Sequence, residues 1–139
     1  MPRILCIDYG LKRTGLAVTD PLQIIATGLT TVESPKLIAF LKDYFKKEEV
    51  ELILIGEPTN WDDSDTHATP LVRAMIVRLK KEFPGIPLKT VDERNTSKMA
   101  SRAMIDMGLS RKKRRNKGLV DEIAATIMLQ EWLTRTVRE

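Results

Sequence analysis

Three apolar segments that each run directly into an acid constrain the fold of this chain more than any other feature. Arg3 to Asp8 (RILCID) and Glu51 to Gly56 (ELILIG), which Glu57 follows, are nearly continuous apolar runs. Such runs are typical of strands buried on both faces of a sheet. Ile86 to Val91 predicts a further strand, and Asp92-Glu93 follows it at once. The sequence therefore predicts central strands that carry carboxylates at their carboxyl ends.

Turn and cap signals divide the rest of the chain into further strands and helices. Gly15 to Thr19 predicts a strand that returns antiparallel to the first, after a basic turn, and another strand is expected near Ile24 to Val32. Ser34-Pro35 and Thr69-Pro70 each place a capping residue before a proline, which is typical of a helix start. The predicted helices run from Ser34 to about Lys47, from Thr69 to before Pro84, from Thr96 or Ser97 to Gly108, and from about Leu119 to Val137.

The predicted order of elements is β-β-β-α-β-α-β-α-α. No linker, repeat or low-complexity segment interrupts it, so we expect one domain over residues 1–139. Strands separated by helices are expected to be parallel neighbours joined by right-handed crossovers. The expected fold class is therefore α/β, with a five-stranded mixed sheet: three antiparallel N-terminal strands plus parallel strands, flanked by helices.

Composition excludes several classes of protein. The chain is 42% hydrophobic and 30% charged, as ordinary globular proteins are. Its apolar runs are much shorter than the roughly 20 residues of a membrane-spanning helix, and no secretory signal opens it. Cys6 is the single cysteine and lies within an apolar run, so we expect a buried thiol and a cytoplasmic protein without membrane contact.

The positive charge of the chain is concentrated in one segment. Residues 111–117 (RKKRRNK) contain six bases and no acid, whereas the other 132 residues carry a net charge of −2. Four acids and no base lie between Glu57 and Asp65. A basic segment of this kind can bind a polyanion, and acids elsewhere can hold cations. The alternative is that both are simply solvated loops.

Acids at the ends of neighbouring strands are expected to converge. In an open α/β sheet the ligand crevice lies outside the carboxyl ends of the strands, where Asp8, Glu57 and Asp92-Glu93 would lie. Asp121, in the first turn of the last predicted helix, is a further candidate. Clustered carboxylates repel one another unless cations are present, and oxygen ligands favour Mg²⁺ or Mn²⁺.

Each acid also has a plainer interpretation. Asp121 could serve the helix macrodipole, and Asp92 and Glu93 could cap the next helix or pair with Arg94. Asp8 is harder to explain in this way, because an acid that closes a buried strand needs a partner, and only Lys12 or Arg13 is nearby in the sequence. Covalent catalysis has no support, because no serine or cysteine has a histidine at a suitable spacing.

Three motifs closely resemble the YqgF family, the Holliday-junction-resolvase-like or pre-16S rRNA nucleases of bacteria. They are IDYGLKRTGLAVTDP, VDERNTS and VDEIAATIMLQEWL, they follow the family's order, and the resemblance covers nearly the whole chain. It implies an RNase H-like fold, a cytoplasmic location and metal-dependent cleavage of phosphodiester bonds, with 5′-end maturation of pre-16S rRNA as the favoured role. It also implies that the catalytic acids are Asp8, Asp92, Glu93 and Asp121.

One departure from the family pattern adds a candidate. Family members usually have an apolar residue between the glycine and proline of GxP, whereas this chain has Gly56-Glu57-Pro58. Related RNase H-like resolvases commonly have an acid at that strand end. We therefore expect a metal site of Asp8, Glu57, Glu93 and Asp121. Whether Glu57 replaces or supplements Asp92 and Glu93 stays open at this point.

Nucleic acid is the expected partner, with RNA favoured and a DNA junction as the alternative. The segment 111–117 is expected to hold flanking phosphates, and bases elsewhere to hold those nearer the cut. The predicted contacts are Lys12, Arg13, Arg94, Arg111, Lys112, Lys113, Arg114, Arg115 and Lys117.

Ribosomal precursor particles are a further candidate partner, and a monomer or weak homodimer is expected. A non-catalytic nucleic-acid-binding module and an actin-like nucleotide-binding domain are the rival hypotheses; the latter needs a second domain of similar size.

Overall fold

The computed structural model describes residues 2–57, 69–92, 102, 105, 108 and 116–138, and five strands within them form one sheet. The strands are β1 (Arg3–Tyr9), β2 (Arg13–Thr19), β3 (Ala26–Glu33), β4 (Val50–Glu57) and β5 (Leu88–Asp92). Their order across the sheet is β3-β2-β1-β4-β5. β1, β2 and β3 pair antiparallel, whereas β1, β4 and β5 pair parallel. The predicted mixed α/β sheet is confirmed.

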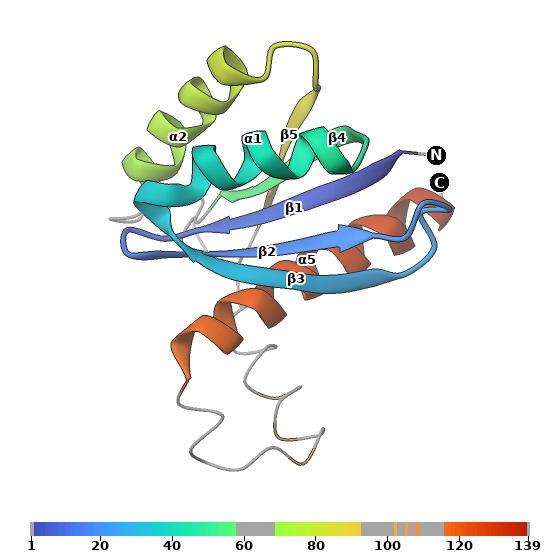
Figure 1. The fold of residues 1–139 in the computed structure, drawn as a ribbon. Coiled ribbons are helices and arrows are strands. Elements are labelled where there is room, and N and C mark those ends of the chain that lie inside the picture. Colours follow the sequence, from blue (N-terminus) through green and yellow to red (C-terminus); the bar gives the residue numbers. More distant parts are fainter. Residues whose placement is uncertain are drawn as a thin grey trace.

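Helices cover both faces of this sheet. In the described ranges they are a short 3-10 helix (Ser34–Lys36), α1 (Leu37–Lys47), α2 (Thr69–Glu82) and α5 (Lys117–Arg138). Figure 1 shows α1 and α2 on one face and α5 crossing the opposite face, with both termini at the end away from the β1–β2 turn. Most of the segment from Thr96 to Gly108, where a further helix is predicted, lies outside the described residues.

Side chains of β1 and β4 alternate between two cores. The core beneath α1 and α2 takes the odd-numbered residues Leu5, Ile7, Ile53 and Ile55. The core beneath α5 takes the even-numbered residues Ile4, Cys6, Leu52 and Leu54. Because both faces of these strands are covered, every position must be apolar, which is why the two segments read as continuous runs. Cys6 is fully buried, as predicted.

The start of the first helix differs from the prediction that Ser34 caps it. Ser34 begins the 3-10 helix, the residue at the N-cap is Glu33, and no side chain caps it. α1 itself begins at Leu37. The Ser34 hydroxyl is occupied elsewhere, because it hydrogen-bonds the Gly10 carbonyl and the Thr14 hydroxyl. The Ser34 hydroxyl, which the local sequence pattern assigns to a helix cap, is therefore used in a tertiary contact instead.

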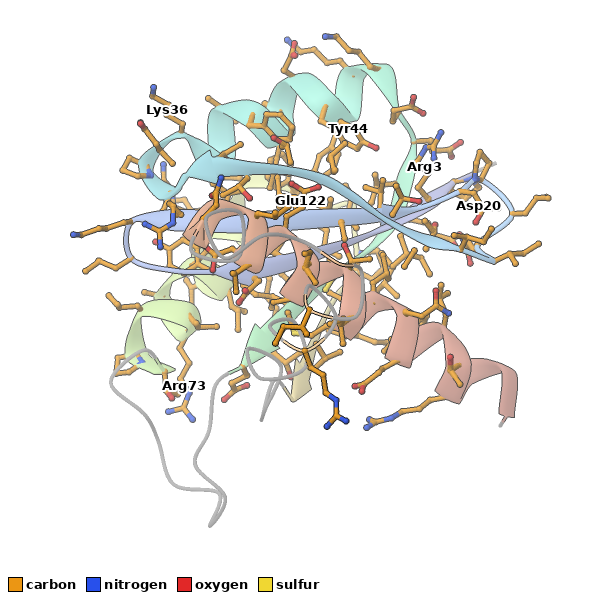
Figure 2. All side chains as sticks on the ribbon, turned by 90° about the horizontal axis from the view of Figure 1, so that it is seen from below. Arg3, Asp20, Lys36, Tyr44, Arg73 and Glu122 are labelled. Atoms are coloured by element: carbon orange, nitrogen blue, oxygen red, sulfur yellow. The ribbon has the colours of Figure 1, made fainter. Side chains whose placement is uncertain are left out.

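α5 approaches β2 so closely at Gly15 that no side chain fits between them. A Cβ atom on Gly15 would overlap the carbonyl group of Asp121 and lie 2.8 Å from the amide nitrogen of Glu122. These are backbone atoms, so they cannot give way unless the whole helix shifts. At the next crossing, a Cβ atom on Gly28 of β3 would overlap the Glu122 carboxyl group. Figure 2 shows Glu122 on the part of α5 that crosses the sheet.

Within the described ranges, no helix combines the length and the apolarity that crossing a bilayer requires.

We expect Gly15→Ala to lower the free energy of unfolding by about 1–3 kcal/mol, because an added methyl group forces α5 away from β2. Urea unfolding followed by circular dichroism measures the change. Gly85→Ala is the matched control, because a Cβ atom there meets nothing within 4 Å. That variant should stay within about 0.5 kcal/mol of the parent. Equal stability of both variants would contradict the close approach of α5.

Candidate active site beside the β1–β2 turn

The parallel strands β1, β4 and β5 bring their carboxyl ends to one edge of the sheet. Asp8 lies near the end of β1, and Glu57 pairs with Asp92 where β4 and β5 end. In register, Asp8 pairs with Gly15 of β2. The backbone therefore brings the carboxyl ends of these strands together, as predicted. Which carboxylates meet there depends on which face of the sheet each side chain takes.

Asp8 and Asp121 line the same pocket. Asp8 continues the Ile4 and Cys6 series along β1, so it belongs to the face that α5 covers. The contact at Gly15 sets the Asp121 turn of α5 over the residue that pairs with Asp8. The result is a pocket of about 360 Å³ lined by Asp8, Gly10, Leu11, Lys12, Arg13 and Asp121. Two acids that are 113 positions apart in the sequence are thus brought together.

Asp121 lies about two residues further into its helix than predicted, and therefore beyond the first turn. Asn116 caps α5, because its Oδ1 accepts a hydrogen bond from the Leu119 amide at 3.2 Å, and the helix begins at Lys117. The first turn contains no acid. The influence of the macrodipole falls off within the first turn, so it explains the position of Asp121 less well than the sequence suggested. The asparagine itself is a cap signal that the sequence analysis did not use.

The carboxylate of Asp121 forms an ion pair with Arg13. Its Oδ2 lies 3.3 Å from Arg13 Nε, and the two side chains are 26% and 38% exposed, respectively. Arg13 precedes Gly15 by two positions on β2, so strand alternation directs both toward α5. The pocket therefore contains two acidic and two basic side chains, with Lys12 as the second cation.

The turn that forms one wall of the pocket is held by Ser34. The Ser34 hydroxyl donates to the Gly10 carbonyl and accepts from the Thr14 hydroxyl at 2.8 Å, and its amide donates to the Lys12 carbonyl at 3.0 Å. Gly10 itself has no room for a side chain, because a Cβ atom would lie 2.6 Å from the Arg13 carbonyl oxygen. The exposed residues Leu11 and Lys12 are therefore carried on a turn that is anchored on both sides.

Glu57 is not among the residues that line this pocket. Its Oε1 lies 3.3 Å from Nη2 of Arg73 on α2, and its side chain is 26% exposed. On β4, Ile53 and Ile55 face α1 and α2, and Glu57 continues that series. The structure thus brings Asp8 and Asp121 together and places Glu57 with α2. A metal-binding role for Glu57 stays a prediction.

Several predicted site residues cannot be placed. Asp92 ends β5, but its side chain is not described, and Glu93 and Arg94 lie outside the described residues. The same holds for Arg111 to Arg115, whereas Lys117 is the first residue of α5. Of the predicted phosphate contacts, Lys12 and Arg13 line the pocket.

The donor set of the pocket fits a hard divalent cation. Mg²⁺ is usually held by one or two carboxylates together with water, and Asp8 and Asp121 supply two. Among the described residues no group of three or more acids, histidines or cysteines could hold a metal ion. A third protein ligand would therefore have to come from side chains beyond that set, such as those of Asp92 and Glu93.

Comparisons with known proteins agree with the resemblance. A model of the family described as "RuvX: Holliday junction resolvase" matches residues 2–135. The chain is 56% identical over 137 residues to a Flavobacterium psychrophilum protein, covering 99% of this chain and 100% of the relative. A Christiangramia forsetii protein is 57% identical over 133 residues, covering 96% and 98%. Both relatives carry the name "Putative pre-16S rRNA nuclease".

The fold resembles that of a solved structure of RuvC. The match is to "T. thermophilus RuvC in complex with Holliday junction substrate", with a TM-score of 0.57 and 17% sequence identity, covering 99% of this chain and 96% of that one. At this identity the likeness shows the fold alone. It confirms the RNase H-like fold that the motifs implied.

Ser34→Ala is expected to lower the free energy of unfolding by about 1–3 kcal/mol, because it leaves the Gly10 carbonyl and the buried Thr14 hydroxyl without that partner. Exchange of the amide hydrogen at position 34, which ties the turn to this residue by donating to the Lys12 carbonyl, should also accelerate. Thr134→Ala is the control, since it removes only an exposed hydroxyl that bonds within its own helix. If exchange at position 34 is unchanged in Ser34→Ala, the Ser34 hydroxyl does not anchor the turn.

Proposed function

This chain belongs to the RuvX family of Holliday junction resolvases, the YqgF family that its motifs indicate, and from that premise we propose that it is a metal-dependent nuclease that cleaves structured nucleic acid. The convergence of Asp8 and Asp121 in one pocket, beside Lys12 and Arg13, supports this function most directly. Carboxylates for a cation and bases for a phosphate are the two groups that metal-assisted phosphodiester hydrolysis needs.

Asp8 and Asp121 would hold Mg²⁺ or Mn²⁺ in this site. The chemistry that such an ion, or a pair of ions, would supply is activation of a water and stabilisation of the departing oxygen of the phosphodiester. The protein's own part is positional. The backbone of Asp8 is fixed by the sheet and that of Asp121 by the contact of α5 with Gly15, so no backbone rearrangement is needed to bring the two side chains into one pocket. We propose Asp92, Glu93 and Glu57 as further acids of the reaction.

We propose that Lys12 binds a phosphate next to the scissile one. It is exposed on the anchored turn and lines the pocket, so its ammonium group can reach a phosphate without repositioning the backbone. Two more cations lie at this end of the molecule: Figure 2 shows Lys36 and Arg73 there, whereas Arg3 and Asp20 lie at the other end. Contacts of this kind bind any phosphate backbone, so they position the substrate without selecting its sequence.

We favour RNA, and specifically the 5′ end of pre-16S rRNA, as the substrate. Two relatives that are 56% and 57% identical to this chain carry the name "Putative pre-16S rRNA nuclease". The choice of the 5′ end rests on the resemblance of the motifs to the family. Precursor particles of the ribosome would then be the cellular partner, in the cytoplasm. A four-way DNA junction is the alternative, because the family description and the RuvC complex both name it.

We expect Asp8→Asn to reduce the cleavage rate by at least about 100-fold, since a lost metal ligand removes several kcal/mol of transition-state stabilisation. Binding to the same RNA at low salt should change less than about threefold, because phosphate contacts dominate affinity. Gel assays with Mn²⁺ measure both, on a labelled pre-16S 5′ fragment and on a four-way DNA junction.

Asp43→Asn is the matched control, because it makes the same change in an exposed acid of α1 that pairs with Lys47. It should cleave at the parent rate. If the parent protein binds these substrates but cleaves neither of them, the result would favour the non-catalytic alternative. Weak binding by Asp8→Asn with normal turnover would contradict the assigned role.

A further inference from the structure

The Arg13–Asp121 ion pair places a cation of the protein itself among the acids of the proposed metal site. Arg13 Nε lies 3.3 Å from Asp121 Oδ2, and both residues line the pocket that contains Asp8. Arg13 is also one of the two bases that line this pocket, where the proposed function places the phosphodiester. One guanidinium group is thus within reach of both a metal ligand and the substrate.

We propose that Arg13 acts as an exchangeable cation: it neutralises Asp121 in the metal-free protein and moves to a phosphate of the nucleic acid when a divalent ion takes Asp121. This inference rests on the proposed nuclease function and assigns Arg13 a positioning role within it. Metal binding and substrate binding are then coupled through one side chain.

The strength of the ion pair suits such an exchange. Two carboxylates in one pocket repel each other without a counter-ion, so a guanidinium group beside them stabilises the empty site. The pair is partly open to solvent, at 38% and 26% exposure, and pairs of this kind are weak. A divalent ion can therefore displace Arg13 without a large energetic cost.

The geometry of Arg13 suits its second position. Its backbone belongs to β2 and pairs with Glu33 of β3, so only the side chain has to move. Arginine presents several donors in a planar fork that matches a phosphate, and it keeps its charge at any physiological pH. Lys12, on the turn beside it, also lines the pocket but lacks that fork, so Arg13 is the better match for a bidentate contact with a phosphate.

Coupling of this kind is reciprocal. If metal binding frees Arg13 for the phosphate, then phosphate binding must increase metal affinity by the same factor. The Arg13–Asp121 contact opposes metal binding in the absence of nucleic acid. Its removal should therefore strengthen binding of the metal alone, which is the opposite of what loss of a metal ligand would do.

Calorimetric titration with Mn²⁺ alone, without nucleic acid, tests the exchange. Arg13→Gln should bind Mn²⁺ about three- to tenfold more tightly than the parent, since the ion then displaces no guanidinium group and meets less positive charge. Arg13→Lys should restore affinity toward the parent value, because it keeps the charge. Lys47→Gln is the matched control, since it breaks an exposed Lys–Asp pair on α1, and its Mn²⁺ affinity should be unchanged.

A second measurement follows the substrate side of the coupling. Affinity for a labelled RNA hairpin is measured with and without Ca²⁺, which takes the same oxygen ligands as Mn²⁺. Ca²⁺ should strengthen binding more for the parent than for Arg13→Gln, because only the parent has an arginine to release.

The outcomes separate the exchange from the function on which it rests. Equal or weaker Mn²⁺ binding by Arg13→Gln, with binding lost in Asp121→Asn, would overturn the exchange and leave the metal site intact. If the parent binds no Mn²⁺ and Asp121→Asn changes nothing, the metal site of the proposed function fails as well. Equal enhancement by Ca²⁺ in the parent and in Arg13→Gln would also count against the exchange.

Discussion

The site depends on the contact between α5 and β2 at Gly15. Helices normally pack on sheets through side chains, but here the backbone of α5 at Asp121 lies directly against a residue without one. Because Gly15 pairs with Asp8, this single contact determines that a helix acid and a strand acid share one pocket. A side chain at position 15 would separate them even if both carboxylates remained in the sequence. The fold thus contributes to the chemistry by fixing the position of Asp121 relative to Asp8. The β1–β2 turn, which Ser34 anchors, forms another wall of the pocket.

The alternation of side chains along the strands then determines which face of the sheet each charged residue takes. Asp8 and Arg13 take the face covered by α5, where Asp121 and Arg13 form their ion pair. Glu57 instead pairs with Arg73 on the α2 side. Two acids at neighbouring strand ends can therefore have quite different surroundings. In the exchange that we propose, Arg13 neutralises Asp121 until the metal ion and the nucleic acid are both present.

The sequence predicted the fold well because its strongest signals are local. The continuous apolar segments of β1 and β4 indicate strands that are buried on both faces, and the proline after Thr69 indicates a helix start. The convergence of Asp8 with Asp121 was predicted only as a meeting of strand ends with a helix, whereas its cause, the missing side chain at Gly15, depends on a contact far away in the sequence. The same is true of Ser34, whose hydroxyl serves Gly10 instead of the helix cap. The motifs predicted the family, and the family match confirmed it. The catalytic and metal-binding roles of Asp8, Asp121, Asp92, Glu93 and Glu57 stay predictions.

A crystal soaked in Mn²⁺ and measured at an X-ray energy where manganese scatters anomalously tests the central claim most directly. Asp8 and Asp121 should each place a carboxylate oxygen within about 2.6 Å of the same anomalous peak or of two adjacent ones, because hard divalent ions bind oxygen ligands within that distance. The Arg13 side chain should have left Asp121 in that crystal. Anomalous peaks confined to other acids, or carboxylates of Asp8 and Asp121 too far apart to share an ion or a bridging water, would contradict a catalytic metal site beside the β1–β2 turn.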